Sequence, residues 1–323
     1  MFPVPFLIVS LLLLIVILYT VYRRLQFSRT VTFAFSNTLF CRNPENNNAC
    51  TPHPTLGPKD PWDAPLALDT YSPETASYCL GILRLAYDAD SASQLVMPSG
   101  FVFVASLQNS LDKERSVGYV LQQEDVLWVV FRGTKHASDF AQDINMTQSP
   151  FRKDGVMVHN GFLQIYVRFA DFLANVLAET LSRKKDSVHT LLLTGHSLGG
   201  ALAMLSLYDA VALYSRTHRV ISYTFGCPRV GNQAFADQLR SKPNVCYRVA
   251  NTSDVFPQVP LPITLNVAHP TRPFFYNHYG KLFSFTDNRL NYTLNHAIDT
   301  YLENIERIGR ENRIEGLLSK AEY

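Results

Sequence analysis

The sequence predicts an α/β fold in which a mixed, mostly parallel sheet carries helices on both of its faces. Apolar runs of strand length alternate along the chain with longer segments whose apolar residues recur at helical spacing. This alternation is typical of strands that are joined by helices and covered on both sides. The expected strands are residues 101–107, 117–122, 126–131, 189–194, 221–225, 245–250 and 282–285, and the expected helices are 73–86, 162–182, 198–215 and 297 to about 310.

The position of each element in the chain indicates its place in the sheet. After the leading helix, strands 101–107 and 117–122 are expected at an edge or in antiparallel pairs, and strand 126–131 leads into a loop. The helix over 162–182 is followed by the basic triplet at 183–185, which favours a helix C-terminus because positive charge offsets the helix dipole there. The last helix should pack back onto the domain, because its apolar residues share one side: Ile298, Tyr301, Leu302, Ile305 and Ile308.

A serine between glycines lies where strand 189–194 leaves the sheet and helix 198–215 begins. Glycines at 195 and 199 remove side chains that would collide with the helix or the adjoining strand, and Gly200 lets the helix approach the sheet. This pattern predicts a nucleophile elbow that presents Ser197 in front of a helix N-terminus, whose N–H groups stabilise an oxyanion. The alternative is a glycine-rich turn with an incidental serine.

A serine nucleophile needs a base and an orienting carboxylate, in the chain order Ser, Asp, His for this type of sheet. Asp254 lies on the loop after strand 245–250, and the carboxyl ends of such strands are where ligand chemistry collects. His296 lies in the loop or first turn before the last helix. These positions predict a Ser197, Asp254, His296 triad, although the chain has 9 histidines and a single one is more often an ordinary surface or core residue.

The motifs resemble those of the class 3 lipase family, the fungal lipase-like α/β-hydrolases, over roughly residues 71–305. The resemblance is an ordered series rather than one motif, and it implies the α/β-hydrolase fold. Besides the elbow, the series comprises Phe131-Arg132-Gly133-Thr134, Val158-His159-Asn160-Gly161-Phe162, Phe225 to Asn232, Asn251 to Pro257, His278-Tyr279-Gly280 and His296.

The resemblance implies a role for each site residue. Ser197 would be the nucleophile, His296 the general base and then the general acid, and Asp254 the group that holds the imidazole tautomer. The backbone N–H groups of Thr134 and Leu198 would form the oxyanion hole, and the Thr134 hydroxyl would add a third donor. Arg132 and Arg229 are expected to brace loops through ion pairs rather than to touch substrate.

In this family a lid lies between Thr134 and Pro150. Here the segment 137–144 carries apolar residues at helical spacing, but only Phe140 and Ile144 are large. A lid of this kind would cover the serine in water and open at a lipid surface. An ordinary surface helix is the alternative.

Composition is compatible with one large domain and excludes some classes of function. The 323 residues are 47% hydrophobic and carry a net charge of +2. This small net charge does not indicate a nucleic-acid partner. No zinc-finger spacing, His-Glu-x-x-His or phosphate loop occurs, so no metal and no other cofactor is expected.

The amino end predicts a membrane segment. Residues 4–22 carry no charge and are followed by Arg23 and Arg24. A stretch of this length nearly crosses a hydrocarbon layer of about 30 Å, and no small-x-small cleavage site follows it closely, so an uncleaved single-pass anchor is favoured over a removed signal peptide. Basic residues after the span predict a cytoplasmic domain, whereas three glycosylation sequons, one of them at Asn251, point to the other side.

The sequence therefore divides into three parts. Residues 1–24 are the anchor or uncleaved signal, 25–70 a linker or pro-region rich in Asn and Pro, and 71–323 the hydrolase-like domain. Cys41 and Cys50 have the spacing to close a small loop, whereas the other three cysteines lie in apolar contexts typical of buried thiols.

These observations predict a membrane-tethered serine carboxylic-ester hydrolase that acts on lipid ester at a membrane or lipid interface. The family implies a lipase that cleaves acylglycerols through an acyl-enzyme. Phospholipase A1 and a non-lipase, feruloyl-type esterase are the alternatives within the class. An inactive binding module with the same fold is a more remote one.

Overall fold

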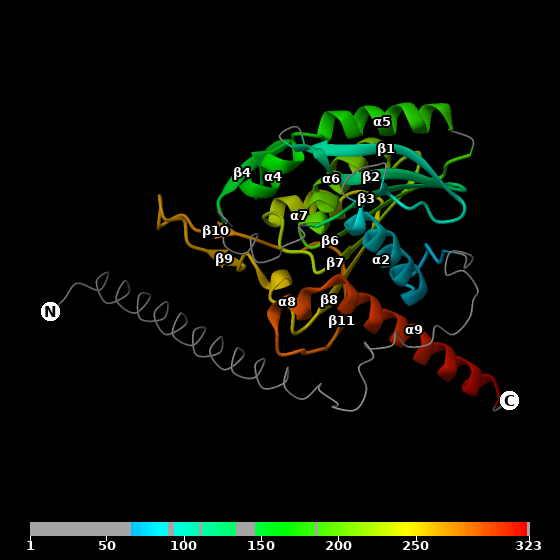
Figure 1. The fold of residues 1–323 in the computed structure, drawn as a ribbon. Helices are drawn as coiled ribbons and strands as arrows, with labels where there is room; N and C mark the ends of the chain where they lie inside the picture. The colour runs from blue at the N-terminus through cyan, green and yellow to red at the C-terminus, as the bar shows by residue number, and fades with distance from the viewer. Residues whose placement is uncertain (1–65, 90–93, 110–111, 134–145, 185–186, 322–323) are drawn as a thin grey trace. The chain divides into compact units, whose positions relative to one another are not determined.

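A sheet of seven strands lies at the centre of the fold (Figure 1). Its spatial order is β1 (Phe101–Asn109), β2 (Asp112–Gln123), β3 (Val126–Phe131), β6 (Thr190–His196), β7 (Arg219–Phe225), β8 (Val245–Asn251) and β11 (Lys281–Phe285). The first three strands pair antiparallel, and every later neighbour is parallel. The sheet is mixed and mostly parallel, which confirms the predicted α/β-hydrolase architecture.

The computed structural model describes residues 66–89, 94–109, 112–133, 146–184 and 187–321. Apart from residues 289–291, they belong to one compact unit. The predicted anchor, most of the linker and the predicted lid lie outside the described residues. Among the described helices, none is long and apolar enough to cross a bilayer.

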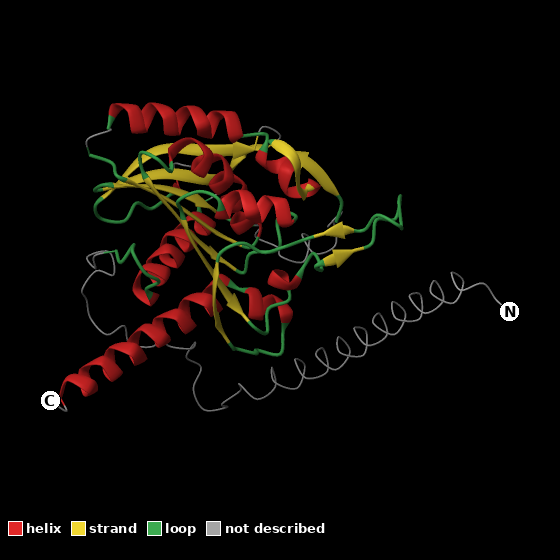
Figure 2. Cartoon of the chain, turned by 180° about the vertical axis from the view of Figure 1, so that it is seen from behind, coloured by secondary structure: helices red, strands yellow, loops and turns green. Residues whose placement is uncertain are grey.

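Helices cover both faces of the sheet (Figure 2). One face carries α4 (Asn160–Tyr166), α5 (Ala170–Arg183), α6 (Leu198–Tyr214) and α7 (Gln233–Arg240), and the other carries α2 (Pro73–Asp88) and α9 (Ile298–Ala321). Side chains of β6 alternate between the two cores, because Leu191 and Leu193 face α6 whereas Leu192 faces α2. The strand is buried on both sides, so it reads as a continuous apolar run in the sequence.

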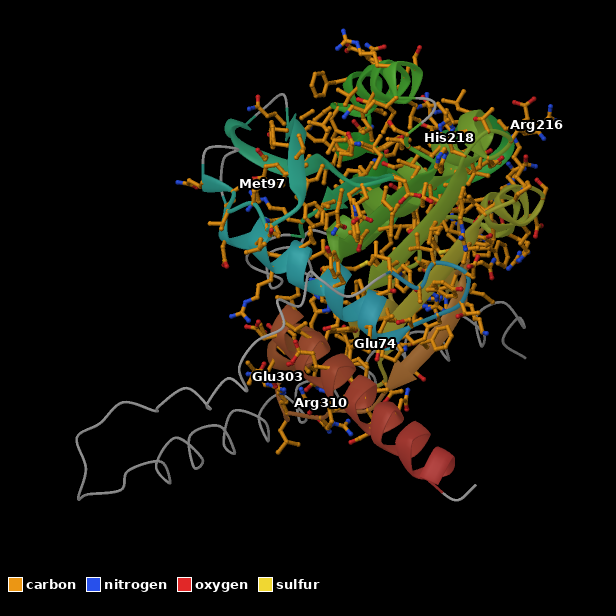
Figure 3. All side chains as sticks on the ribbon, turned by 90° about the vertical axis from the view of Figure 1, so that its right-hand side faces the viewer. Glu74, Met97, Arg216, His218, Glu303 and Arg310 are labelled. Carbon is orange, nitrogen blue, oxygen red and sulfur yellow. The ribbon has the colours of Figure 1, made fainter. Side chains whose placement is uncertain are left out.

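Helices α2 and α9 pack side by side, as Figure 3 shows through the labelled residues Glu74, Glu303 and Arg310. Tyr301 and Ile305 are buried against the sheet, which confirms that the last helix packs back onto the domain. Two details differ from the prediction. The last helix continues to Ala321, and a short helix, α8 (Tyr292–His296), precedes it.

The prediction of one continuous helix over 162–182 is wrong, because two helices stand there. Residues 167–169 form a turn between α4 and α5, with N–H bonds to carbonyls three residues back at Arg168 and Phe169. The turn directs Phe169 into the core, where its ring lies 5.7 Å from that of Phe131. Burial of this large aromatic side chain outweighs the lost helical hydrogen bonds.

Several short elements were not predicted. They are the hairpin of β4 (Gln148–Phe151) and β5 (Lys153–His159), helix α7, the 3₁₀ turn η3 (Phe256–Gln258), and the hairpin of β9 (Ile263–Thr264) and β10 (Phe274–Phe275). Both hairpins pair outside the central sheet.

His159 begins α4 and gives the fold an acid-sensitive point. Its Nδ1 accepts the Phe162 N–H at 3.4 Å, so the ring proton lies on Nε2, which is buried without a hydrogen-bond partner among the described residues. Burial lowers the pKa of His159 to about 4. The unfolded chain binds this proton near pH 6.5, so the stabilisation is complete above that pH and declines as the pH falls toward 4.

We expect the titration of His159 to lower the free energy of unfolding by about 2 kcal/mol when the pH falls from 7.5 to 5. His159→Asn keeps an N-cap acceptor but does not titrate. Over the same pH interval, the free energy of unfolding of the variant should therefore fall by about 2 kcal/mol less than that of the parent. Urea unfolding at the two pH values measures both changes. An identical fall in the parent and the variant would show that His159 is not the titrating group.

Candidate active site

Ser197 occupies a strained turn between β6 and α6. Its φ is 58° and its ψ is −126°, a backbone conformation that residues other than glycine rarely adopt. The turn is possible because a Cβ at Gly195 would lie 2.1 Å from the Gly199 carbonyl oxygen, and one at Gly199 would lie 2.2 Å from the Phe131 oxygen. The predicted nucleophile elbow is therefore present.

A continuous chain of hydrogen bonds joins the three residues proposed as the triad. The Ser197 Oγ lies 2.7 Å from His296 Nε2, and His296 Nδ1 lies 2.6 Å from Asp254 Oδ2. All three side chains are buried, with 3%, 2% and 1% of Ser197, His296 and Asp254 exposed. This geometry allows the imidazole to take the serine proton while the carboxylate stabilises the imidazolium.

Asp254 is held by two further donors. Its Oδ1 accepts the Phe256 N–H at 2.9 Å, and its Oδ2 accepts the Tyr301 hydroxyl at 2.7 Å. The Tyr301 oxygen in turn accepts the Asn251 N–H at 3.1 Å. The burial of Tyr301 and the nearby Asp254 charge raise the pKa of Tyr301 well above its usual value, so its hydroxyl keeps its proton and remains a donor.

The Asn251 side chain fixes the loop that carries the acid. Its amide nitrogen donates to the Asp287 and Asn295 carbonyls at 2.7 and 3.0 Å, and its oxygen accepts the N–H groups of Ser253 and Asp287. The side chain is fully buried. This sequon is therefore not accessible for glycosylation in the folded chain, so it does not support an extracellular domain.

The His296 ring is fixed from two sides. The Phe256 ring stacks on it at a centroid distance of 3.8 Å and an angle of 23°. On another side stands Gly226, whose φ is +57° and where a Cβ would lie 3.0 Å from His296 Cε1. Glycine at 226 thus serves both a left-handed turn and close packing against the base.

A second histidine supports the first through the backbone. His196 Nε2 donates to the His296 carbonyl at 2.9 Å, and the Tyr87 hydroxyl donates to His196 Nδ1 at 2.8 Å. Because a carbonyl only accepts, this network requires the neutral tautomer with the proton on Nε2. Burial and the adjacent His296 lower the pKa of His196 well below its usual value, which agrees with that tautomer.

One of the two predicted oxyanion donors can be located. Leu198 is the first residue of α6, where backbone N–H groups have no partner within the helix. Thr134 lies outside the described residues, so its position is not assigned. The preceding Gly133 packs beside the nucleophile, since a Cβ there would lie 3.2 Å from Ser197 Cβ and 2.1 Å from the Tyr87 hydroxyl.

The arginines and cysteines that the sequence singled out are structural. Arg132 Nε donates to the Ser116 carbonyl at 2.6 Å, and Arg229 donates to the Pro260 carbonyl at 2.9 Å, so each arginine braces a loop through a backbone carbonyl. Three thiols are free and buried, as expected: Cys79, Cys227 and Cys246. Burial raises the pKa of Cys227 and of Cys246 to about 12, so neither is a nucleophile at neutral pH.

Sequence reasoning brought Ser197, Asp254 and His296 together but missed Tyr301 and His196 as supporting groups. In the sequence, Tyr301 stands out only as part of an apolar helix side, and His196 only as part of the elbow. A weak signal was available, because each lies within five residues of a triad member. Tyr87 gave no such signal, because it lies more than 100 residues before His196 in the sequence.

Tyr301→Phe should lower kcat about tenfold, because it removes one of the hydrogen bonds to the ionised Asp254. KM should change little, since Tyr301 is fully buried and does not reach substrate. The matched control is Tyr166→Phe, which removes the buried Tyr166 to Asp209 hydrogen bond of 2.8 Å away from the triad. Steady-state kinetics of both variants test this prediction, and an equal loss of kcat in the two would contradict a positioning role for Tyr301.

Comparison with known proteins shows similarity to lipases in both sequence and fold. The family model described as lipase (class 3) matches residues 128–263. The lipase of Rhizopus niveus is 34% identical over 161 residues, which cover 47% of this chain and 40% of that protein. A chloroplastic phospholipase A(1) of Arabidopsis thaliana is 30% identical over 155 residues, which cover 43% of this chain and 34% of that protein. The match thus spans two fifths or less of the length of these relatives.

Solved structures extend the similarity beyond the region of matched sequence. A lipase from Rhizopus microsporus var. chinensis has a TM-score of 0.54 and 25% identity, with coverage of 71% of this chain and 81% of that chain. Lipase II from Rhizopus niveus also gives a TM-score of 0.54 at 25% identity, with coverage of 66% and 80%.

Proposed function

Because the chain belongs to the class 3 lipase family, we propose that it hydrolyses carboxylic esters through a covalent acyl-enzyme on Ser197. The observation that carries the proposal is the hydrogen-bonded series of Ser197, His296 and Asp254 on the strained elbow. An inactive binding module would not need this arrangement, because the strain at Ser197 and the burial of Asp254 both cost stability.

The geometry suggests a reaction in two halves. His296 Nε2 takes the Ser197 proton while Oγ attacks the ester carbonyl, and the Leu198 N–H stabilises the resulting oxyanion. The intermediate collapses, the bond to the alcohol oxygen breaks, and His296 returns its proton to that oxygen. Water then attacks the acyl-enzyme while His296 takes one of its protons. The second collapse releases the fatty acid, and the proton returns to Ser197.

The proposed substrate is an acylglycerol, because the fungal relatives are lipases. A phospholipase A1 activity is the second candidate, since a plant phospholipase A(1) is 30% identical over 155 residues. Both reactions cleave a glycerol ester and use the same triad, so they differ only in the head group that the site tolerates. A feruloyl-type esterase is the third alternative and requires no lipid surface.

The test is fatty acid release by the purified full chain from three esters. These are a short soluble nitrophenyl ester, emulsified trioleoylglycerol, and phosphatidylcholine with different chains at the two glycerol positions. A lipase releases acid fastest from the emulsion, and a phospholipase A1 releases the first-position chain of the phospholipid. A folded chain that hydrolyses none of the three contradicts the proposed function, and one that hydrolyses only the soluble ester favours the non-lipase esterase.

We also propose that residues 4–22 anchor the chain to a membrane as a single span. The support is the uncharged stretch itself, followed by Arg23 and Arg24. The buried Asn251 removes one argument for an extracellular domain. Extraction of membranes at alkaline pH tests the anchor, since a chain that is released without detergent would not be membrane-spanning.

A further inference from the structure

The hairpin of β9 and β10 presents an apolar face to the surroundings. Its first strand and the residues on either side of that strand carry an exposed apolar side chain at every second position: Leu261, Ile263, Leu265 and Val267. The register adds a fifth member, because Phe275 pairs directly with Ile263 and therefore lies on the same side. These five residues are called the hairpin face below. Each is more than half exposed, and Val267 reaches 83%.

Such a cluster is unusual on a surface that faces only water. Scattered exposed aliphatic side chains are normal, whereas a contiguous group marks a surface that meets another apolar phase or partner. In Figures 1 and 2 the loop that joins β9 and β10 extends away from the central sheet. The hairpin face is thus carried at a projecting point and not in a groove.

The base of the hairpin is fixed firmly to the domain. Tyr276 is fully buried, and its hydroxyl lies 3.0 Å from the carbonyl oxygens of Met146 and of Thr147. Gln148 donates to the Phe275 carbonyl at 2.7 Å, and Arg229 donates to the Pro260 carbonyl at 2.9 Å. The hairpin is therefore anchored at both of its ends.

This base is continuous with the catalytic loop. Asp254 is followed directly by η3, whose Phe256 stacks on the His296 ring, and Leu261 begins the hairpin face only a few residues later. The Tyr276 contacts also lie immediately after the segment 134–145, which contains the predicted lid. A surface bound by the hairpin would thus lie close in the chain to the loop that carries Asp254 and Phe256.

Charge around the hairpin favours one kind of partner. The chain contains no Asp or Glu between Asp254 and Asp287, whereas Arg272 stands exposed in the loop that joins the strands. An apolar face beside a cation, in a segment of the chain without acidic residues, complements a surface that has a hydrocarbon interior and anionic head groups. It offers no polar pattern with which to select a particular protein.

We propose that the hairpin face inserts into a phospholipid membrane and holds the catalytic site against it. This inference rests on the proposed function, because it names the surface from which the ester substrate is drawn. The five apolar side chains enter the boundary between head groups and acyl chains, and Arg272 meets lipid phosphate. The insertion is additional to any anchor at residues 4–22 and uses a different part of the chain.

Insertion can be measured with a tryptophan placed on the hairpin face of the full chain. Leu265→Trp is matched by Leu213→Trp, because Leu265 and Leu213 are both 63% exposed. Leu213 lies near the end of α6, close in sequence to Arg216 and His218, which precede β7 and mark the other end of the sheet (Figure 3). Both variants keep residues 4–22, so any common anchor contributes equally to both.

Each variant is mixed with vesicles of phosphatidylcholine and phosphatidylglycerol whose acyl chains are brominated, and the signal of the parent chain is subtracted. Bromine should quench the added fluorescence of Leu265→Trp and leave that of Leu213→Trp unchanged. Equal quenching of the two, or none for Leu265→Trp, would overturn the proposal. A tryptophan that becomes buried without quenching while the molecular mass doubles would also overturn it and assign the hairpin face to self-association.

Kinetics supply an independent readout. In Leu265→Asp, the ratio of turnover of vesicular ester to turnover of soluble ester should fall about tenfold or more, because one inserted apolar side chain is lost and a charge is added. Leu213→Asp should leave this ratio unchanged. An unchanged ratio in Leu265→Asp contradicts the proposal. If the parent hydrolyses neither ester, the proposed function fails, and the quenching measurement still decides whether the hairpin inserts.

Discussion

Ser197→Ala is expected to lower kcat by about 10⁶-fold, because the only atom that forms the acyl-enzyme is removed. The variant should fold as the parent does. Alanine keeps the Cβ of serine, so the strain at φ 58° is unchanged, and the lost hydroxyl has His296 as its partner. Substrate binding should persist, since the elbow backbone and the Leu198 N–H stay in place.

Turnover of a soluble ester by the two chains, with circular dichroism of both, measures this effect. The matched control is Ser206→Ala, which removes another buried hydroxyl from α6 at a distance from the triad and should leave kcat unchanged. Substantial residual turnover by a well-folded Ser197→Ala chain would mean that a different residue is the nucleophile.

Asp254→Asn is expected to lower kcat by about 10⁴-fold, a smaller loss than that of the serine variant. The carboxylate accepts from three donors, namely His296 Nδ1–H, the Tyr301 hydroxyl and the Phe256 N–H. An amide has one end that donates, so at least one of these donors must face an NH₂ group in either orientation. If that group faces His296, the imidazole accepts on Nδ1, carries its proton on Nε2 and no longer accepts a proton from Ser197.

Asp209→Asn provides the control for this substitution. Asp209 accepts from Tyr166 and from Arg152 at 2.8 and 2.7 Å outside the site, so its loss should lower stability without a large change in kcat. Kinetics and urea unfolding of both variants separate the two effects. A fall in kcat for Asp254→Asn that is no larger than that for Asp209→Asn would remove Asp254 from the triad.

The central sheet and the hydrogen-bonded arrangement of Ser197, Asp254 and His296 were predictable because each has a strong local cause. The apolar run before Gly195 is buried on both faces, and a tight turn next to a helix demands glycine at fixed positions. Asp254 and His296 follow Ser197 in the chain order that is expected for this type of sheet. These constraints are local in the sequence even though the contacts they produce are distant.

The hairpins and the supporting network were not predictable by the same means. The β9 and β10 strands are only two residues long, and their apolar residues stay exposed, so burial does not impose a pattern. The break before Ala170 depends on how Phe169 packs in the core. The spacing of apolar residues in the sequence does not predict that packing. Tyr301 reaches Asp254, and Tyr87 reaches His196, from helices on the far side of the sheet, and only the assembled fold reveals that proximity.

The most direct test of the account is covalent labelling of the purified, detergent-solubilised full chain with a fluorophosphonate, followed by peptide mapping. The hydrogen-bonded triad predicts one modified residue, Ser197, and no modification in Ser197→Ala. Labelling at Ser197 would establish an activated serine. A folded parent chain that stays unmodified, or one that is modified elsewhere, would contradict the assignment of Ser197 as the nucleophile.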